Sequence, residues 1–295
     1  MALTLAEASK LSNDVLLAGV IETVIMDSPV LQHLPFIEIV GNGLTYNREN
    51  TPAGAAFFAV GDIWTESTPT FTQETATLRI LGGDADVDNF LAQTRSNVQD
   101  LETAVIQLKA RAVQRLFDDY FINGDSTADP KAFDGLDRLC APEQTISLGA
   151  NGGQLTLEKL DELVDQVKGG KPDLLIMSKR SRRKLNSLAR NSGAFLETDR
   201  NEFGQMVQFY DGIPVATSDF ISDAQTVGTS TDCSTIYAVQ FGEGGLAGLT
   251  SPGGLQVERI GSLEEKDATR TRIKWYASLA LFNTLKLARL TGVRP

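Results

Sequence analysis

The longest periodic pattern in the chain predicts one amphipathic helix over residues 98–122. Its ends match known signals: Ser96 with Gln99 resembles a capping box, and Asn123 with Gly124 resembles a left-handed stop. Such a helix would span about 38 Å at about 1.5 Å per residue, so we expect it to be the spine of the fold. Apolar residues recur at intervals of three and four. The expected apolar stripe is Val98, Leu101, Val105, Leu108, Ala112, Leu116 and Tyr120, flanked by Ile106, Val113, Phe117 and Phe121.

Two strand-like segments, residues 36–47 and 69–81, enclose a turn-rich connection. Both are largely polar on at least one face, and the connection is longer than the ~12 to 15 residues usual in a compact domain. We therefore expect an extended hairpin that leaves its own domain and lies on another subunit. Large apolar residues near its tip have no core of their own, and we predict that they are buried against a neighbour. They are Phe57, Phe58, Ile63 and Trp64; a local cluster folded back on its own domain is the alternative.

The remaining pattern predicts an N-terminal arm and a mixed α+β region. An apolar face over residues 16–25 predicts an early helix that ends at Ser28 and Pro29. Further along, helix 155–167 precedes a buried strand at 173–177, and Ser178 caps a helix that runs to about residue 189. Later strands are expected at 235–241, 255–260, 269–281 and 284–290, with the second and third of them paired.

Composition narrows the class of protein. The chain has 295 residues and a net charge of -11, which argues against a stand-alone nucleic-acid binder. Cys140 and Cys233 lie too far apart for a metal or redox motif, so two reduced thiols are expected. No segment reaches the ~18 apolar residues of a membrane span, and the N-terminus does not resemble a signal peptide. We expect a protein kept or assembled in a cytoplasm.

Candidate chemistry is sparse, and we expect no catalytic residue, cofactor or metal. His33 is the only histidine, so no His-based triad can form within one chain. The glycine run that starts at Gly242 superficially resembles a dinucleotide fingerprint but cannot open the helix that would hold the phosphate. Asp84, Asp86 and Asp88 lack the later glycine and glutamate of a calcium loop, so a solvated acidic turn is expected.

One charge cluster is unusual: Lys179, Arg180, Arg182, Arg183 and Lys184 crowd the first turns of a predicted helix. Positive charge there opposes the helix dipole by about 0.3 to 1 kcal/mol per residue. Our hypothesis is an acidic surface on a neighbouring subunit, formed by Glu264, Glu265 and Asp267. Contact with DNA and a merely solvated face are the alternatives.

The order of these elements resembles the major capsid protein of tailed bacteriophages, which has the Hong Kong 97 fold. The likeness covers about residues 36–291 and is carried by the phrases FINGD, DGL and GIPV before Ser218 and Asp219, in that order. The resemblance implies an N-terminal arm at 1–35 and an extended hairpin loop at 36–81. It implies a peripheral domain with the spine helix at 82–139 and 251–282, and an axial domain at 140–250 and 283–295.

The resemblance also implies a non-enzymatic shell subunit of a virion, forming hexamers and pentamers around double-stranded DNA without sequence-specific binding. Some members join neighbours through a lysine and an asparagine, but no lysine lies between Lys10 and Lys109 and loop 261–270 has no asparagine. We therefore predict no covalent crosslink. Either scaffolding is a separate protein or the sequence begins after processing; portal and decoration proteins are further implied partners. An encapsulin-type nanocompartment shell and a nucleotide-binding enzyme are the rival hypotheses.

Overall fold

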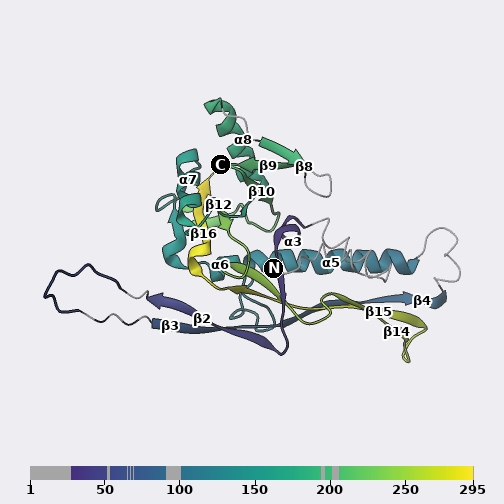
Figure 1. The fold of residues 1–295 in the computed structure, drawn as a ribbon. Coiled ribbons are helices and arrows are strands. Elements are labelled where there is room, and N and C mark those ends of the chain that lie inside the picture. The colour runs from purple at the N-terminus through teal and green to yellow at the C-terminus, as the bar shows by residue number, and fades with distance from the viewer. Residues whose placement is uncertain are drawn as a thin grey trace.

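The computed structural model describes residues 28–51, 54–64, 66, 68, 70–90, 101–193, 197–200 and 206–294. Figure 1 shows a long sheet with one helix along it, a second sheet with two helices, and a two-stranded hairpin that leaves the body. The fold is α+β, as predicted. The predicted first helix and the predicted start of the spine helix lie outside the described residues.

Strand β15 (Ala268–Leu281) is the centre of the five-stranded sheet. On one side it pairs antiparallel with β4 (Arg79–Asp88) over all ten positions of that strand. On the other side it pairs antiparallel with β14 (Gln256–Ser262) and β13 (Leu246–Thr250), and β1 (Phe36–Glu38) adds parallel to β13. The predicted pairing of β14 with β15 is confirmed.

The prediction of an acidic turn at residues 84–88 was wrong, because these residues belong to β4. Alternation buries Ala85 and Val87, which leaves the aspartates on the opposite face. There Arg272 Nε donates to Asp84 Oδ1 and Arg270 Nε donates to Asp86 Oδ1, both at 2.6 Å. These hydrogen bonds hold the pKa of both carboxyl groups below the usual range. Charge pairs across the strands therefore replace the expected solvated turn.

The spine helix α5 (Leu101–Asn123) lies along the five-stranded sheet, as Figure 1 shows, but its buried face is not the predicted stripe. Leu108 and Leu116 are 65% and 43% exposed, whereas the flanking residues face the sheet. The helix has more apolar positions than one face can hold, so spacing alone did not decide which row packs inward. The buried row is Ile106, Ala110, Val113, Phe117 and Phe121.

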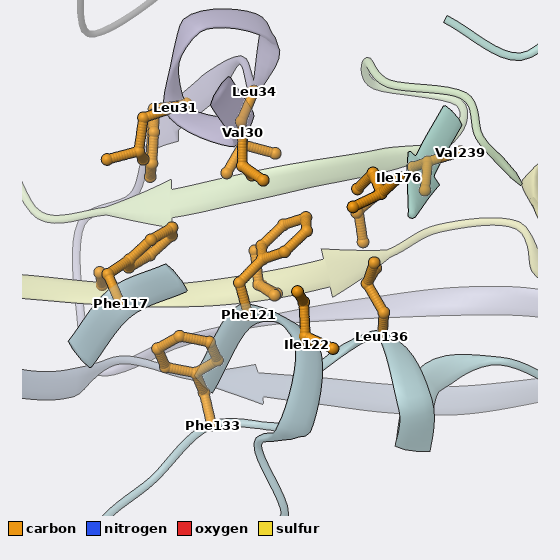
Figure 2. Packing of buried hydrophobic residues seen from close by; sticks show 14 of the residues in the cluster. Val30, Leu31, Leu34, Phe117, Phe121, Ile122, Phe133, Leu136, Ile176 and Val239 are labelled. Atoms are coloured by element: carbon orange, nitrogen blue, oxygen red, sulfur yellow. The ribbon is translucent and has the colours of Figure 1, made fainter. Parts of the chain in front are cut away.

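Phe117 lies at the centre of an aromatic cluster between α5 and the sheet. Its ring stacks on Trp275 of β15 with centroids 4.8 Å apart, and it also contacts Phe36 and Phe133. Figure 2 shows how α3 (Pro29–His33) and the residue after it close this core from the other side. Val30, Leu31 and Leu34 contribute these side chains. Ser28 caps α3, so the Ser28–Pro29 signal begins a helix here.

The second sheet has nine strands, in the order β5–β16–β12–β7–β10–β9–β8 with β6 and β11 at its margins. Helices α7 (Leu157–Gln166) and α8 (Lys179–Ser192) pack on it, with Leu160, Leu163 and Leu185 fully buried. Strand β16 (Leu287–Arg294) lies inside the sheet, since it pairs with β12 on one side and with β5 and β6 on the other. The remaining strands are β5 (Thr145–Ser147), β6 (Gly153–Gln154), β7 (Leu174–Met177), β8 (Glu197–Arg200), β9 (Met206–Tyr210), β10 (Ile213–Thr217), β11 (Gln225–Val227) and β12 (Ser230–Val239).

Hairpin strands β2 (Gly43–Thr51) and β3 (Thr70–Thr77) form a separate two-stranded sheet. The prediction of one strand over residues 36–47 was wrong, because the chain turns between β1 and β2 at Gly41, whose φ is +116°. Toward the far end of the paired strands, where Arg48 lies opposite Thr72, Arg48 Nη2 donates to the carbonyl oxygen of Leu281 at 2.8 Å. The strands pack on the body through Tyr46, whose ring centroid lies 5.0 Å from that of Phe282, and Figure 1 shows the loop beyond them projecting from the body.

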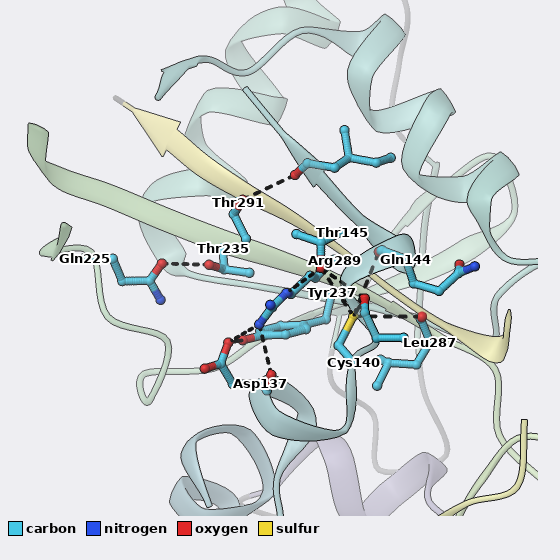
Figure 3. A network of polar contacts seen from close by, with 12 residues as sticks. Asp137, Cys140, Gln144, Thr145, Gln225, Thr235, Tyr237, Leu287, Arg289 and Thr291 are labelled. Carbon is cyan, nitrogen blue, oxygen red and sulfur yellow. Dashed lines mark hydrogen bonds and ion pairs between the residues drawn. The ribbon is translucent and has the colours of Figure 1, made fainter. Parts of the chain in front are cut away.

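A polar network joins the short helix α6 (Leu136–Leu139) to the second sheet, as Figure 3 shows. Arg289 Nη1 donates to Asp137 Oδ1 at 2.6 Å, and Arg289 Nε donates to Thr145 Oγ1 at 2.9 Å. The Tyr237 hydroxyl also donates to Asp137, and burial raises the pKa of this tyrosine. Since α6 follows the spine helix closely, the network fixes the second sheet against the end of α5.

Candidate intersubunit surfaces

The tip of the hairpin loop exposes large apolar side chains. Phe57 and Val60 are fully exposed, and Ile63 and Trp64 are 88% and 78% exposed. Phe58 and Trp64 stack on each other with ring centroids 4.5 Å apart, which holds the two arms of the loop together. The loop therefore contains a local aromatic pair, yet the apolar side chains described at its tip join none of the buried clusters of the chain's body.

The loop tip is shaped by a turn at residues 59–62. The amide of Ala59 donates to Asp62 Oδ2 at 2.6 Å, and the amide of Asp62 donates back to the carbonyl oxygen of Ala59 at 3.2 Å. Gly61, with a φ of +97°, supplies the left-handed conformation that the turn needs. The turn presents Phe57 and Ile63 as a small exposed apolar surface.

Acidic groups of the same chain neutralise part of the positive charge of the basic cluster on α8. Lys179 pairs with Asp219 at 2.7 Å. Arg180 is largely buried; its Nε lies 3.4 Å from Asp223 Oδ1, and its guanidinium donates to the carbonyl oxygens of Asp232 and Val293. These contacts give Arg180 a structural role within one chain, whatever α8 does in an assembly.

The other two predicted arginines of α8 differ from Arg180. Arg183 is exposed. Arg182 is half-buried, and its Nε has no hydrogen-bond partner among the described residues. The arginine best placed to meet a neighbour is therefore Arg183.

The predicted acidic partner surface lies in the loop between β14 and β15. Glu264 and Glu265 are exposed, whereas Asp267 accepts a 2.6 Å hydrogen bond from Asn89 Nδ2. Figure 1 shows this end of β14 and β15 far from α8. A contact between the acidic loop and α8 would therefore have to join two copies of the chain, and it stays a prediction.

Two hollows near the start of β4 were not among the predicted sites. A polar pocket of about 380 Å³ is lined by arginines at positions 48, 79 and 138, with Glu74 and Asp134. An apolar groove of about 170 Å³ lies beside it, between Ile80 of β4 and Leu116 of α5. Ile80 is the residue that could have pointed to this region, because it interrupts the polar face of β4; its side chain is 80% exposed.

One buried carboxyl group lies between the arm-side helix and the spine. Asp118 of α5 accepts a 2.6 Å hydrogen bond from Ser28 Oγ and a second one from Gln114 Nε2. Burial raises the pKa of Asp118 to about 6, against the opposing effect of these two donors. The carboxyl group is thus placed to sense pH at the contact between α3 and α5.

The described residues do not assemble a catalytic or metal centre. No group of three or more His, Cys, Asp or Glu residues among them is arranged to hold a metal ion. The segment after the glycine run at Gly242 forms strand β13, so no helix N-terminus is available for a dinucleotide phosphate. In the same described part, no helix has the length and apolar character of a membrane span.

Comparisons with known proteins give a family by sequence and a shared fold by structure. The model of the "Phage capsid family" matches residues 11–287. The solved holo-SrpI encapsulin complex from Synechococcus elongatus PCC 7942 is 19% identical with a TM-score of 0.71, over 100% of this chain and 97% of that chain. The capsid of a native GTA particle is 15% identical with a TM-score of 0.66, over 92% of this chain and 90% of that chain. The structure from Microbacterium phage Oxtober96 is 16% identical with a TM-score of 0.63, over 91% of each chain. No curated protein matches the chain by sequence.

Proposed function

We propose, on the premise that this chain belongs to the phage capsid family and has the Hong Kong 97-type fold, that it is the major capsid subunit of an icosahedral shell. It assembles into hexamers and pentamers through its N-terminal arm, its extended loop and its spine helix. The observation that carries this proposal is the loop tip, where Phe57, Val60 and Ile63 are exposed far from any core of their own chain. Apolar surface of that kind is stabilised when a second copy covers it.

The same premise divides the chain into functional regions. The spine helix with the five-stranded sheet is the peripheral domain, and the nine-stranded sheet with α7 and α8 is the axial domain around the capsomer axes. Strands β1 and β13 pair within the five-stranded sheet, so this proposal moves residues 36–38 out of the predicted hairpin loop, and residues 246–250 out of the predicted axial domain, into the peripheral domain. The loop tip lies outside both domains, which suits a segment that reaches a neighbour.

The enclosed cargo in this proposal is double-stranded DNA, held without sequence-specific binding. The net charge of -11 supports a wall that does not attract its genome and is filled by a packaging motor through a portal. A separate scaffolding protein directs closure, a decoration protein is a further candidate partner, and assembly takes place in the host cytoplasm. Neighbours are not joined by isopeptide bonds, because the loop carries no lysine.

An encapsulin-type nanocompartment is the second candidate, favoured by the similarity to the SrpI encapsulin over the full length of this chain. A capsid and a nanocompartment differ in cargo. Particles purified from the native host that contain nuclease-resistant double-stranded DNA would support the capsid. Particles that instead contain one abundant second protein, and little DNA, would support the nanocompartment.

The proposal is tested by expressing the chain alone and together with a neighbouring scaffold gene, followed by negative-stain microscopy and analytical ultracentrifugation. Closed shells or free capsomers are expected. Replacing Phe57 and Ile63 with serine should shift the chain toward monomers, whereas Ile260→Ser, at a half-exposed position of β14, is the matched control. A uniform monomer of the unmodified chain under every condition would contradict a shell function.

A further inference from the structure

The polar pocket of about 380 Å³ near the start of β4 lies between the hairpin and the body of the chain. Residues of β2 and β3 line one part of it, and the loop after α5, helix α6 and the end of β15 line the rest. We call it the hairpin pocket. Hydroxyl groups come from both parts, with Thr77 on the hairpin and Ser126 and Ser278 on the body. A ligand in this pocket would therefore contact the hairpin and the body at the same time.

Positive charge exceeds negative charge around the hairpin pocket. Three arginines, at positions 48, 79 and 138, line it together with the carboxylates of Glu74 and Asp134, so three positive charges minus two negative ones leave +1. Arg138 and Asp134 neutralise each other, because their side chains form an ion pair at 3.1 Å. Arg48 Nη1 lies 4.0 Å from Glu74 Oε1, at the limit of an ion pair. The uncompensated charge therefore belongs to Arg48 and Arg79.

Arg48 and Arg79 each have an unsatisfied hydrogen-bond donor in this pocket. The Nε atoms of both side chains are buried and have no hydrogen-bond partner in the part of the chain that the structure describes. Arg79 also forms no ion pair with a described residue. A buried donor without an acceptor is destabilising, and a guanidinium bonds to an oxyanion about twice as strongly as neutral groups bond to each other. The pocket therefore favours an oxyanion as its ligand.

Glu74 determines which oxyanion fits. Its carboxylate accepts no hydrogen bond from a described residue, and an ionised carboxylate can only accept. Inorganic phosphate keeps at least one proton near neutral pH and can donate it to such a carboxylate. Sulfate and the phosphodiester groups of nucleic acids have no proton to donate, so Glu74 would repel them. A pocket that combines unsatisfied arginines with a free carboxylate therefore selects a protonated oxyanion.

We propose that the hairpin pocket binds inorganic phosphate. Arg48 and Arg79 donate to the phosphate oxygens, and a phosphate hydroxyl group donates to the Glu74 carboxylate. This inference goes beyond the shell function, because the site lies within one chain and needs no neighbouring copy.

Bound phosphate would strengthen the contact between the hairpin and the body. In the structure, the Tyr46 ring packs on Phe282, and Arg48 Nη2 donates to the carbonyl oxygen of Leu281. A ligand held by Arg48 of β2 beside Ser126 of the body would add a polar link to these contacts. The backbone amides of β3 should then open less often, so their exchange with solvent should slow when phosphate binds.

Equilibrium dialysis of the purified full chain against ³²P-labelled phosphate tests the site. Saturable binding of one phosphate per chain is expected. Arg79→Gln should weaken this binding by about tenfold or more, because it removes a charge-assisted donor. Arg115→Gln is the matched control and should bind as the unmodified chain does, since Arg115 is exposed on α5 and does not line the pocket. No phosphate binding by the unmodified chain, or an equal loss in both variants, would overturn the proposal.

Competition distinguishes the possible sources of the oxyanion. Sulfate and a short single-stranded oligonucleotide should each displace labelled phosphate about tenfold less well than unlabelled phosphate does. Glu74→Gln should abolish the preference over sulfate, because an amide can donate to it. Displacement by sulfate or by the oligonucleotide as effective as displacement by phosphate would overturn inorganic phosphate as the ligand.

Hydrogen–deuterium exchange of β3 gives an independent readout. Phosphate, compared with chloride at the same ionic strength, should slow exchange over residues 70–77 in the unmodified chain and in Arg115→Gln, but not in Arg79→Gln. Unchanged exchange in all three chains would overturn the link between the ligand and the hairpin. A chain that binds phosphate but never assembles would contradict the shell function alone, and a chain that assembles without binding phosphate would contradict this site alone.

Discussion

Ser28 Oγ donates a 2.6 Å hydrogen bond to Asp118 of the spine helix, and the same oxygen accepts from the amide of Leu31 to cap α3. One hydroxyl group therefore begins a helix and fixes it to the spine. The pKa of Asp118 is raised to about 6 by burial, so the carboxyl group is largely neutral in mildly acidic solution and charged above that pH.

The stability of the contact between α3 and α5 should depend on this titration. Because the folded pKa of about 6 exceeds the unfolded value of 3.8, the folded chain binds more protons between these values, and its stability falls as pH rises through them. Asp118→Asn removes the titration. The variant should gain up to about 3 kcal/mol of unfolding free energy over the unmodified chain between pH 4 and 7, at about 1.4 kcal/mol per pKa unit. Urea unfolding of unassembled chains across this range is the measurement, and parallel pH curves would contradict the prediction.

Removal of the ring at the centre of the aromatic cluster should destabilise the fold severely. Phe117→Ala leaves a cavity beneath Trp275 and should lower the free energy of unfolding by about 3 to 5 kcal/mol. The adjacent Leu116→Ala is the control, because this side chain is 43% exposed in a single chain, and the substitution should cost about 1 kcal/mol or less. Similar losses in the two variants, measured on unassembled chains, would show that the buried row of α5 is assigned wrongly.

Two arginines of α8 should have different roles: Arg180 should stabilise the single chain, and Arg183 should act in association between chains. Arg180→Ala leaves the carbonyl oxygens of Asp232 and Val293 without their donor and should cost about 1 to 3 kcal/mol of stability in the unassembled chain. Arg183→Glu should leave that stability unchanged and weaken assembly at low salt. If Glu264 and Glu265 are its partners on a neighbour, reversing their charge should restore particles. Normal assembly of Arg183→Glu at low salt would contradict an intersubunit role for this arginine.

Mature particles should dissociate into single chains when boiled in detergent. The loop between residues 48 and 79 contains no lysine, so its tip cannot form an isopeptide bond through an amine. Denaturing electrophoresis of particles with and without reducing agent should show only the monomer band. Ladders that survive reduction would show a crosslink of another kind.

Much of the fold could be predicted from sequence signals that are local. Helix α7 lies within the segment that periodicity predicted, and α8 begins directly after its predicted cap, Ser178, although it runs past residue 189. The pairing of β14 with β15 followed from two alternating segments near each other. The predicted Hong Kong 97-type fold is likewise confirmed. This prediction came from the order of the elements along the chain, which local signals had given.

The errors have a common physical origin in contacts between distant segments. The buried row of α5 is chosen by Trp275 and Phe36, which lie far from Phe117 in sequence, and periodicity alone cannot see them. Residues 84–88 form part of a strand and not the predicted acidic turn, because Arg270 and Arg272 of β15 pair with Asp86 and Asp84. The two hollows near the start of β4 were missed because β4, α5 and the loop after α5 come together only in three dimensions.

The place of β16 inside the nine-stranded sheet has a consequence for synthesis. Because residues 287–294 pair with strands on both sides, that sheet cannot close until residue 294 has left the ribosome. The spine helix and its hairpin emerge much earlier. A nascent chain would therefore expose its loop while half of its body is still unfolded. Translation itself would delay the moment at which a chain is competent to join a partner.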